Sequence, residues 1–131
     1  MAANVAENPY KVNKGLKRIF LATVYSYQGL FAGIRFESAF RQEALLASLM
    51  APCAFLIGRD LVEVVILIAT LILVLVTELL NSAIEAVVDR ISYEWHELAK
   101  RAKDYGSAAV HLTLLFCGGT WGAFLLRRLL Q

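Results

Sequence analysis

Charged residues, prolines and cysteines are all scarce in this chain of 131 residues. Only 18% of the residues are charged, against about 25% in a usual soluble domain, and 59% are hydrophobic. The two cysteines, Cys53 and Cys117, lie in separate apolar stretches without neighbours at metal-ligand spacing. The composition therefore argues against a disulfide framework, a zinc site and an ordinary soluble domain. The net charge of +2 is small and comes from clusters, so a nucleic-acid protein is not indicated.

Two familiar nucleotide-binding signatures are also missing. The sequence has neither the G-x-x-x-x-G-K-[ST] loop that cradles phosphates nor the kinase glycine-rich loop with its H-R-D and D-F-G partners. These absences argue against a P-loop nucleotide-binding fold and against a protein-kinase fold. Any phosphoryl transfer by this chain must therefore use helices to bind the nucleotide and align an acceptor hydroxyl.

The hydrophobic residues form one amphipathic segment and three long apolar segments. After a polar tail at residues 1–14, apolar residues recur at helical spacing over about residues 15–33, which is typical of a surface helix in the headgroup plane. Gly29 and Gly33 predict a bend before the next element. The other segments approach or exceed the ~20 apolar residues that cross a bilayer. They predict membrane helices at about residues 39–57, 61–90 and 106–128, within one all-α membrane domain over residues 1–131.

Loop lengths and basic residues predict the topology. Only residues 58–60 separate the first two membrane segments, so these two helices are expected to form a tight hairpin. Ten lysines and arginines fall on one side of the predicted membrane and three on the other. By the positive-inside bias, the N-terminus and the loop at residues 90–104 are expected to be cytoplasmic and the C-terminus external.

Polar residues line one face of the second membrane segment. Glu78, Asn81, Glu85 and Asp89 follow one another at steps of three, four and four residues, which places them on the same helix face. At ~1.5 Å per residue, Glu78 lies roughly 25 Å along a helix that begins at Leu61, near the edge of the hydrocarbon. An unpaired carboxylate at that depth costs on the order of 1–3 kcal/mol. This polar stripe, the four residues just named, therefore predicts a functional site.

Two further acids, Glu37 and Glu43, reach the same depth from the start of the first membrane segment. Converging carboxylates with few compensating cations predict a divalent ion. Magnesium is typically held by one or two carboxylates together with the phosphates of a substrate, which points to a nucleotide. A structural alternative is that the acids form ion pairs with Arg41 or Lys103. Such pairing could explain one acidic residue, but it explains several acids on one helix face less well.

Position along the stripe predicts different roles for its members. Glu78 lies where a lipid hydroxyl would sit and is the candidate general base. Glu85 lies nearer water and is better placed for a metal and phosphates. The cytoplasmic loop next to the stripe supplies candidate nucleotide contacts, namely Glu94, Trp95, His96, Lys103 and Asp104.

Four motifs in collinear order are specific enough to indicate a family. They are E-S-A-F-R-Q-E from Glu37, the E-x-x-N-x-x-x-E-x-x-x-D stripe from Glu78, E-W-H-E-L from Glu94 and A-K-D-Y-G-S-A-A from Ala102. Over about residues 15–126 the chain closely resembles the small integral-membrane diacylglycerol kinases of bacteria. The resemblance implies a homotrimer in the cytoplasmic membrane with active sites between neighbouring subunits. It also implies transfer of the γ-phosphoryl group of Mg-ATP to diacylglycerol, giving phosphatidic acid and ADP.

The resemblance implies a role for each matching residue. Glu78 looks like the general base, and Glu37 and Glu85 look like the Mg²⁺ ligands. The implied nucleotide contacts are Arg18, Tyr25, Glu37, Glu85, Glu94, Trp95, His96, Lys103 and Asp104. The implied lipid contacts are Arg41, Gln42, Glu43, Arg59, Glu78 and Ser107, while Asn81 and Asp89 support the site. The chain departs from the family pattern at Pro52 and Ser92.

Two other functions remain open at this point. An undecaprenol kinase would use the same acids and metal to phosphorylate another alcohol at the membrane interface. The residues of the motifs resemble the diacylglycerol branch of the family more closely. A cation or proton conduit is a non-enzymatic alternative. Such a conduit needs ionisable groups through the membrane midplane, whereas Val64 to Val76 contains only Thr70 as a polar residue. A passive helical scaffold would leave the polar stripe unexplained.

Overall fold

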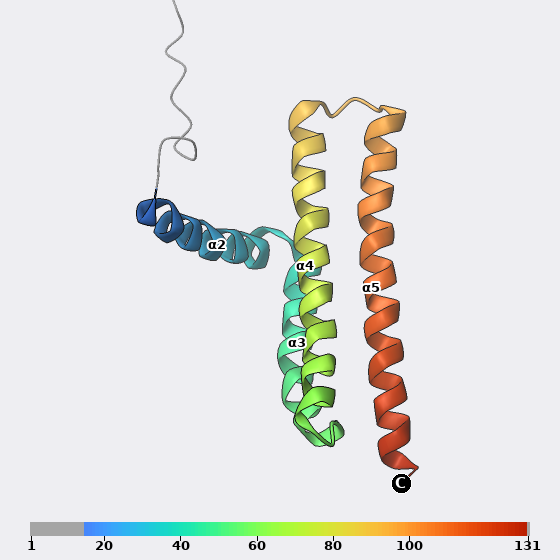
Figure 1. Ribbon diagram of the computed structural model, residues 1–131. Coiled ribbons are helices and arrows are strands. Elements are labelled where there is room, and N and C mark those ends of the chain that lie inside the picture. Colours follow the sequence, from blue (N-terminus) through green and yellow to red (C-terminus); the bar gives the residue numbers. More distant parts are fainter. Residues whose placement is uncertain (1–14, 131) are drawn as a thin grey trace, which may run out of the picture. The chain divides into compact units, whose positions relative to one another are not determined.

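The computed structural model describes residues 15–130, which form helices joined by short connections (Figure 1). The helices are α2 (Leu16–Phe36), α3 (Ser38–Ile57), α4 (Leu61–Ile91) and α5 (Glu97–Leu129). The polar tail predicted at residues 1–14 lies outside the described residues. No strand occurs within residues 15–130, and α3, α4 and α5 are each long and apolar enough to cross a membrane. The predicted all-α membrane fold is thus confirmed.

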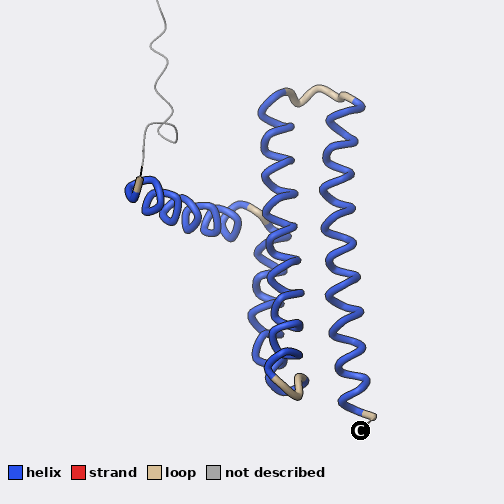
Figure 2. The backbone as a smooth tube through the Cα atoms, viewed as in Figure 1, coloured by secondary structure: helices blue, strands red, loops and turns tan. Residues whose placement is uncertain are grey.

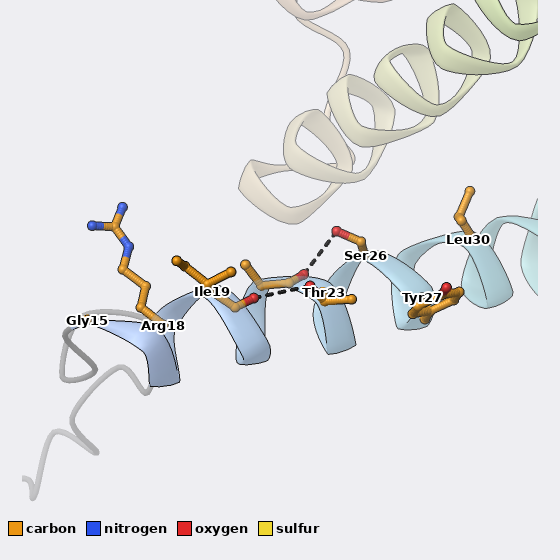
Figure 3. A pocket seen from close by; sticks show the side chains of 8 residues that line it. Gly15, Arg18, Ile19, Thr23, Ser26, Tyr27 and Leu30 are labelled. Atoms are coloured by element: carbon orange, nitrogen blue, oxygen red, sulfur yellow. Dashed lines mark hydrogen bonds between the residues drawn. The ribbon is translucent and has the colours of Figure 1, made fainter.

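The chain divides into two compact units, Met1–Ala32 and Gly33–Gln131. The first unit contains most of α2, whose Thr23 and Ser26 hydroxyls donate hydrogen bonds to the carbonyls of Ile19 and Ala22 one turn earlier. These bonds satisfy the hydroxyls within the helix itself. Figure 3 shows both bonds along the hollowed face of this helix.

The predicted bend at Gly29 and Gly33 is wrong, because α2 continues through both glycines to Phe36. The helical path is interrupted at Glu37 instead. Gly33 is buried where an added Cβ would press against the side chains of Phe40 and Leu79. That glycine therefore serves a close packing contact in the second unit and not a turn.

In the second unit, α4 and α5 lie side by side in opposite directions, and α3 runs back along the first part of α4 (Figures 1 and 2). The connections between these helices are short, at residues 58–60 and 92–96. An apolar core cluster joins α3, α4 and α5 around the fully buried Leu67. Its buried members are Ala54, Val64, Leu67, Leu71, Val74, Cys117 and Trp121.

Trp121 ties α5 to the middle of α4. Its indole Nε1–H lies 3.3 Å from the Leu67 carbonyl oxygen and 3.2 Å from the Thr70 hydroxyl oxygen. The Thr70 hydroxyl in turn donates to the same carbonyl at 2.8 Å. The one polar side chain between Val64 and Val76 is therefore occupied by a packing contact, which argues against a conduit through the midplane.

We expect Trp121→Phe to lower stability because the carbonyl and hydroxyl lose their indole donor while most of the ring volume is kept. The expected loss is about 0.6–2 kcal/mol, the range found for hydrogen bonds between membrane helices. Thermal unfolding in detergent, followed by circular dichroism, measures it. The matched control is Trp95→Phe, because Trp95 is 79% exposed. Equal losses in the two variants would contradict this role of the indole.

Polar contacts connect the helices at the end of the bundle that is far from the polar stripe, where α4 begins and α5 ends. The Asp60 carboxylate caps α4 by accepting a hydrogen bond from the Glu63 backbone N–H at 2.9 Å. The Glu63 carboxylate accepts from the Arg59 backbone N–H and forms an ion pair with Arg127 at the end of α5. The Asp60 cap and the Arg59–Glu63 hydrogen bond thus stabilise the tight hairpin that the sequence predicts, and the Glu63–Arg127 ion pair joins the start of α4 to the end of α5.

The start of α5 differs from the prediction, since the helix begins at Glu97 and not near residue 106. The His96 imidazole caps it by accepting from the Leu98 backbone N–H at 3.1 Å. Lys100 and Asp104 then pair one turn apart at 2.6 Å. These local interactions extend the helix beyond the apolar run. Asp104 and its neighbour Lys103 are consequently held on a helix and not in the predicted loop.

Candidate active site

The polar stripe continues the buried face of α4. Going along the helix, Leu71, Val74, Glu78 and Asn81 are buried in sequence, at the three- and four-residue steps of a single helix face. Glu78 is 6% exposed and Asn81 is 9% exposed. Glu85, one turn further, is partly exposed. The stripe therefore faces the interior of the helix bundle and rises from the apolar core toward the loop at residues 92–96.

Carboxylates from two helices gather around Glu78. Glu78 interacts electrostatically with the carboxylate of Glu85, on α4, and with that of Glu37, at the start of α3. Glu43, one to two turns along α3 from Glu37, also interacts electrostatically with Glu78. Its Oε2 atom is buried without a hydrogen-bond partner. The site thus concentrates negative charge in a poorly solvated place, which is the setting that attracts a cation.

Asn81 connects the stripe to both α4 and α5. Its Nδ2 donates a hydrogen bond to Glu85 Oε1 at 3.0 Å. Its Oδ1 is buried without a partner and lies against Gly106 of α5. Gly106 is absent from the predicted site residues. The available signal was an isolated glycine inside a helical pattern, in the motif that begins at Ala102.

Asp89 and Lys103 form the other link between α4 and α5, with Lys103 Nζ 2.6 Å from Asp89 Oδ1. The structural alternative of pairing with Lys103 therefore holds for this member of the stripe. Arg41 pairs with none of the acids among the described residues; its guanidinium donates to the carbonyls of Ile34 and Arg35. Within the described residues, Glu37, Glu43 and Glu78 form no ion pair with a basic side chain, so structural pairing does not account for these three acids.

A surface hollow of about 580 Å³ opens beside the Asp89–Lys103 pair. Its volume falls in the range of small-molecule sites, roughly 300–1,000 Å³. The lining combines the loop at residues 92–96 with the first turns of α5. It includes all five predicted loop contacts, namely Glu94, Trp95, His96, Lys103 and Asp104. The exposed aromatic Trp95 and the Lys103 ammonium offer a stacking surface and a positive charge, as a nucleotide requires.

Several predicted site residues lie neither among the acids around Glu78 nor in the lining of this hollow. Arg18 and Tyr25 belong to the other compact unit, which ends at Ala32. Arg18 lines a hollow along α2 there, with Ile19 and Leu30 among others (Figure 3). Arg59 lies in the hairpin at the opposite end of α4 from the loop at residues 92–96. The other two, Gln42 and Ser107, are exposed on α3 and α5.

The carboxylates fit a magnesium ion that arrives with a nucleotide. Among residues 15–130, no three His, Cys, Asp or Glu side chains converge closely enough to hold a metal by themselves. Magnesium does not need such a cage, because one or two carboxylates, water and substrate phosphates complete its coordination. Glu37 and Glu85, which both interact electrostatically with Glu78, are two carboxylates that would suffice for such an ion.

Fold and site together define an all-helical membrane protein with acidic side chains at one end of an apolar helix bundle. The sequence profile of prokaryotic diacylglycerol kinases matches residues 24–125. The diacylglycerol kinase of Haemophilus influenzae is 46% identical over 111 residues, which cover 85% of this chain and 94% of that protein. That of Pseudomonas aeruginosa is 48% identical over 122 residues, or 93% of this chain and 99% of its own. That of Escherichia coli K12 is 48% identical over 107 residues, or 82% and 88%.

The chain therefore belongs to the prokaryotic diacylglycerol kinase family. This confirms the resemblance that the four motifs carry, and with it the expectation of a membrane-embedded enzyme that phosphorylates a lipid. Its three apolar helices agree with a place in the bacterial inner membrane.

Proposed function

We propose that this chain transfers the γ-phosphoryl group of ATP to the hydroxyl of diacylglycerol, giving phosphatidic acid and ADP, with Glu78 as the general base. The observation that carries this proposal is the burial of Glu78 among Glu37, Glu43 and Glu85 at the end of the apolar face of α4. A carboxylate in this place can meet a lipid alcohol from the membrane side and a nucleotide from the loop side.

In the proposed reaction, the diacylglycerol hydroxyl oxygen attacks the γ-phosphorus while the bond to the bridging oxygen of ADP breaks. Glu78 accepts the hydroxyl proton as the new ester bond forms. Glu37 and Glu85 would hold Mg²⁺, which would neutralise charge on the phosphate oxygens. Glu43, with Arg41 and Gln42, is proposed to contact the lipid headgroup.

The hollow beside the loop at residues 92–96 is the proposed nucleotide-binding site. Lys103 neutralises phosphate charge there, while Trp95 offers an aromatic face to the base. The pairing of Lys103 with Asp89 supports this role, because it keeps the ammonium at the wall of the hollow before a nucleotide arrives. Arg18 and Tyr25 are proposed as further nucleotide contacts on the strength of the motif match.

We also propose a homotrimer with a cytoplasmic N-terminus and an external C-terminus. The most apolar stretches of α3 and α5 are each only 11% buried within one chain. Much apolar surface is thus left for lipid and for neighbouring subunits. Basic residues concentrate near the active-site end of the bundle, which supports a cytoplasmic location for that end.

The choice of acceptor is tested with the full chain reconstituted in mixed micelles. We expect radiolabelled γ-phosphate from Mg-ATP to appear in phosphatidic acid when diacylglycerol is supplied. Undecaprenol under the same conditions is the matched alternative, since it also presents a hydroxyl at the interface. A higher kcat/KM for undecaprenol would reassign the acceptor, and labelling of neither lipid would refute the kinase proposal for this chain.

A further inference from the structure

The contact between Asn81 and Gly106 has a consequence for Glu85. Gly106 is buried, and it lies on the face of α5 that meets the polar stripe of α4. A Cβ added at Gly106 would overlap the Asn81 Oδ1 atom and would lie 3.2 Å from Asn81 Cγ. The same Cβ would lie 3.6 Å from Asn81 Cα, an ordinary van der Waals distance. The overlap therefore concerns the amide group of Asn81 and not its backbone.

The Asn81 amide has one hydrogen bond that fixes its direction. Its Nδ2 donates to Glu85 Oε1, whereas its Oδ1 is buried without a partner. A side chain at Gly106 would be accommodated most easily by rotation of this amide, since the helix backbones can then stay in place. Such a rotation would carry Nδ2 away from the Glu85 carboxylate and leave that carboxylate without its donor.

We propose that Gly106 is a positioning residue: its lack of a side chain leaves the space in which the Asn81 amide holds the Glu85 carboxylate. The inference rests on the proposed function, in which Glu85 is a Mg²⁺ ligand. Groups that orient a metal-binding carboxylate change metal affinity by about 10–100-fold when they are removed. Gly106 thus acts on the metal through Asn81, although it has no side chain of its own.

The test compares Gly106→Ala with Gly119→Ala in the full chain in detergent. Gly119 lies on the same helix, but apart from its chain neighbours and the backbone of its own helix no atom lies within 4 Å of a Cβ added there. Binding is measured without turnover, by electron paramagnetic resonance of Mn²⁺ in the presence of a non-hydrolysable ATP analogue. We expect Gly106→Ala to weaken Mn²⁺ binding by about tenfold and to raise the Mg²⁺ concentration for half-maximal activity similarly. Gly119→Ala is expected to leave both quantities unchanged.

A double-mutant cycle separates this role from simple packing. Asn81→Ala removes the amide that Gly106 accommodates, so it should weaken Mn²⁺ binding to the same extent as Gly106→Ala. Adding Gly106→Ala to Asn81→Ala should then cause no further loss, because the group through which the glycine acts is gone. A purely structural glycine would instead lower the unfolding temperature and leave the metal dependence unchanged.

Several outcomes would overturn the inference. Wild-type metal affinity in Gly106→Ala, or independent and additive losses in the double variant, would show that the glycine does not act through Asn81. If Gly106→Ala does not fold, Asn81→Ala decides alone, and wild-type Mn²⁺ binding in that variant refutes the inference. Absence of kinase activity in the wild-type chain would refute the proposed function instead, so the two failures are distinguishable.

Discussion

Glu78→Gln is expected to lower the rate of lipid phosphorylation by about 10²–10⁴-fold, the range in which a general base contributes to catalysis. Glutamine keeps the shape of the side chain but does not accept the hydroxyl proton. Folding should be preserved, because Glu78 lies among the like charges of Glu37, Glu43 and Glu85, and the substitution removes one charge from that group. The initial rate at saturating lipid and ATP measures the effect.

Glu43→Gln is the matched control, since Glu43 is the neighbouring acid on α3 and also interacts with Glu78. As a lipid-side contact it should affect the apparent affinity for diacylglycerol more than the maximal rate. If Glu43→Gln abolishes turnover while Glu78→Gln retains most of its activity, the general base is Glu43. Circular dichroism of both variants should match that of the wild-type chain.

The membrane helices and the polar stripe were predictable because both depend on local periodicity. An apolar run of sufficient length predicts a crossing in any context. Likewise, steps of three and four residues place Glu78 and Asn81 on one face whatever packs against it. Periodicity also connects that face with the core residues Leu71 and Val74, which explains why the stripe faces the bundle interior.

The start of α5 and the unbroken course of α2 through Gly33 differ from the sequence prediction for different physical reasons. Hydropathy registers only the part of α5 that is apolar, whereas its first turns are held by the His96 cap and by charge pairing near Lys100. Gly33 was interpreted as a bend because glycine is a weak helix former. Its actual constraint is a tertiary contact with Phe40 and Leu79, which lie elsewhere along the chain.

The contacts between α4 and α5 at the site were the least predictable part. The Asp89–Lys103 pair joins residues 14 positions apart, and the sequence offered this pairing only as an alternative. The approach of Gly106 to Asn81 depends on the rotation of one helix against the other. Such relations depend on the packing of whole helices, so a pattern within a single helix contains no information about them.

Glu85→Gln is expected to weaken Mg²⁺-dependent nucleotide binding by about 10–100-fold, because an amide is a poorer ligand than a carboxylate and offers no charge. The same change replaces the carboxylate oxygen that accepts the Asn81 hydrogen bond by a neutral amide oxygen. Activity measured as a function of Mg²⁺ at fixed ATP should therefore show a large shift in the Mg²⁺ requirement. Raising the Mg²⁺ concentration is expected to restore part of the rate.

Asp89→Asn is the control that separates metal ligation from general loss of negative charge. Asp89 lies one turn beyond Glu85 on the same face, but its carboxylate is paired with Lys103. Its substitution should change the apparent KM for ATP through the freed Lys103, with little change in the Mg²⁺ requirement. Equal Mg²⁺ shifts in Glu85→Gln and Asp89→Asn would mean that the stripe attracts the cation by its field alone. A shift confined to Glu85→Gln, and to Glu37→Gln on α3, would assign the two ligands.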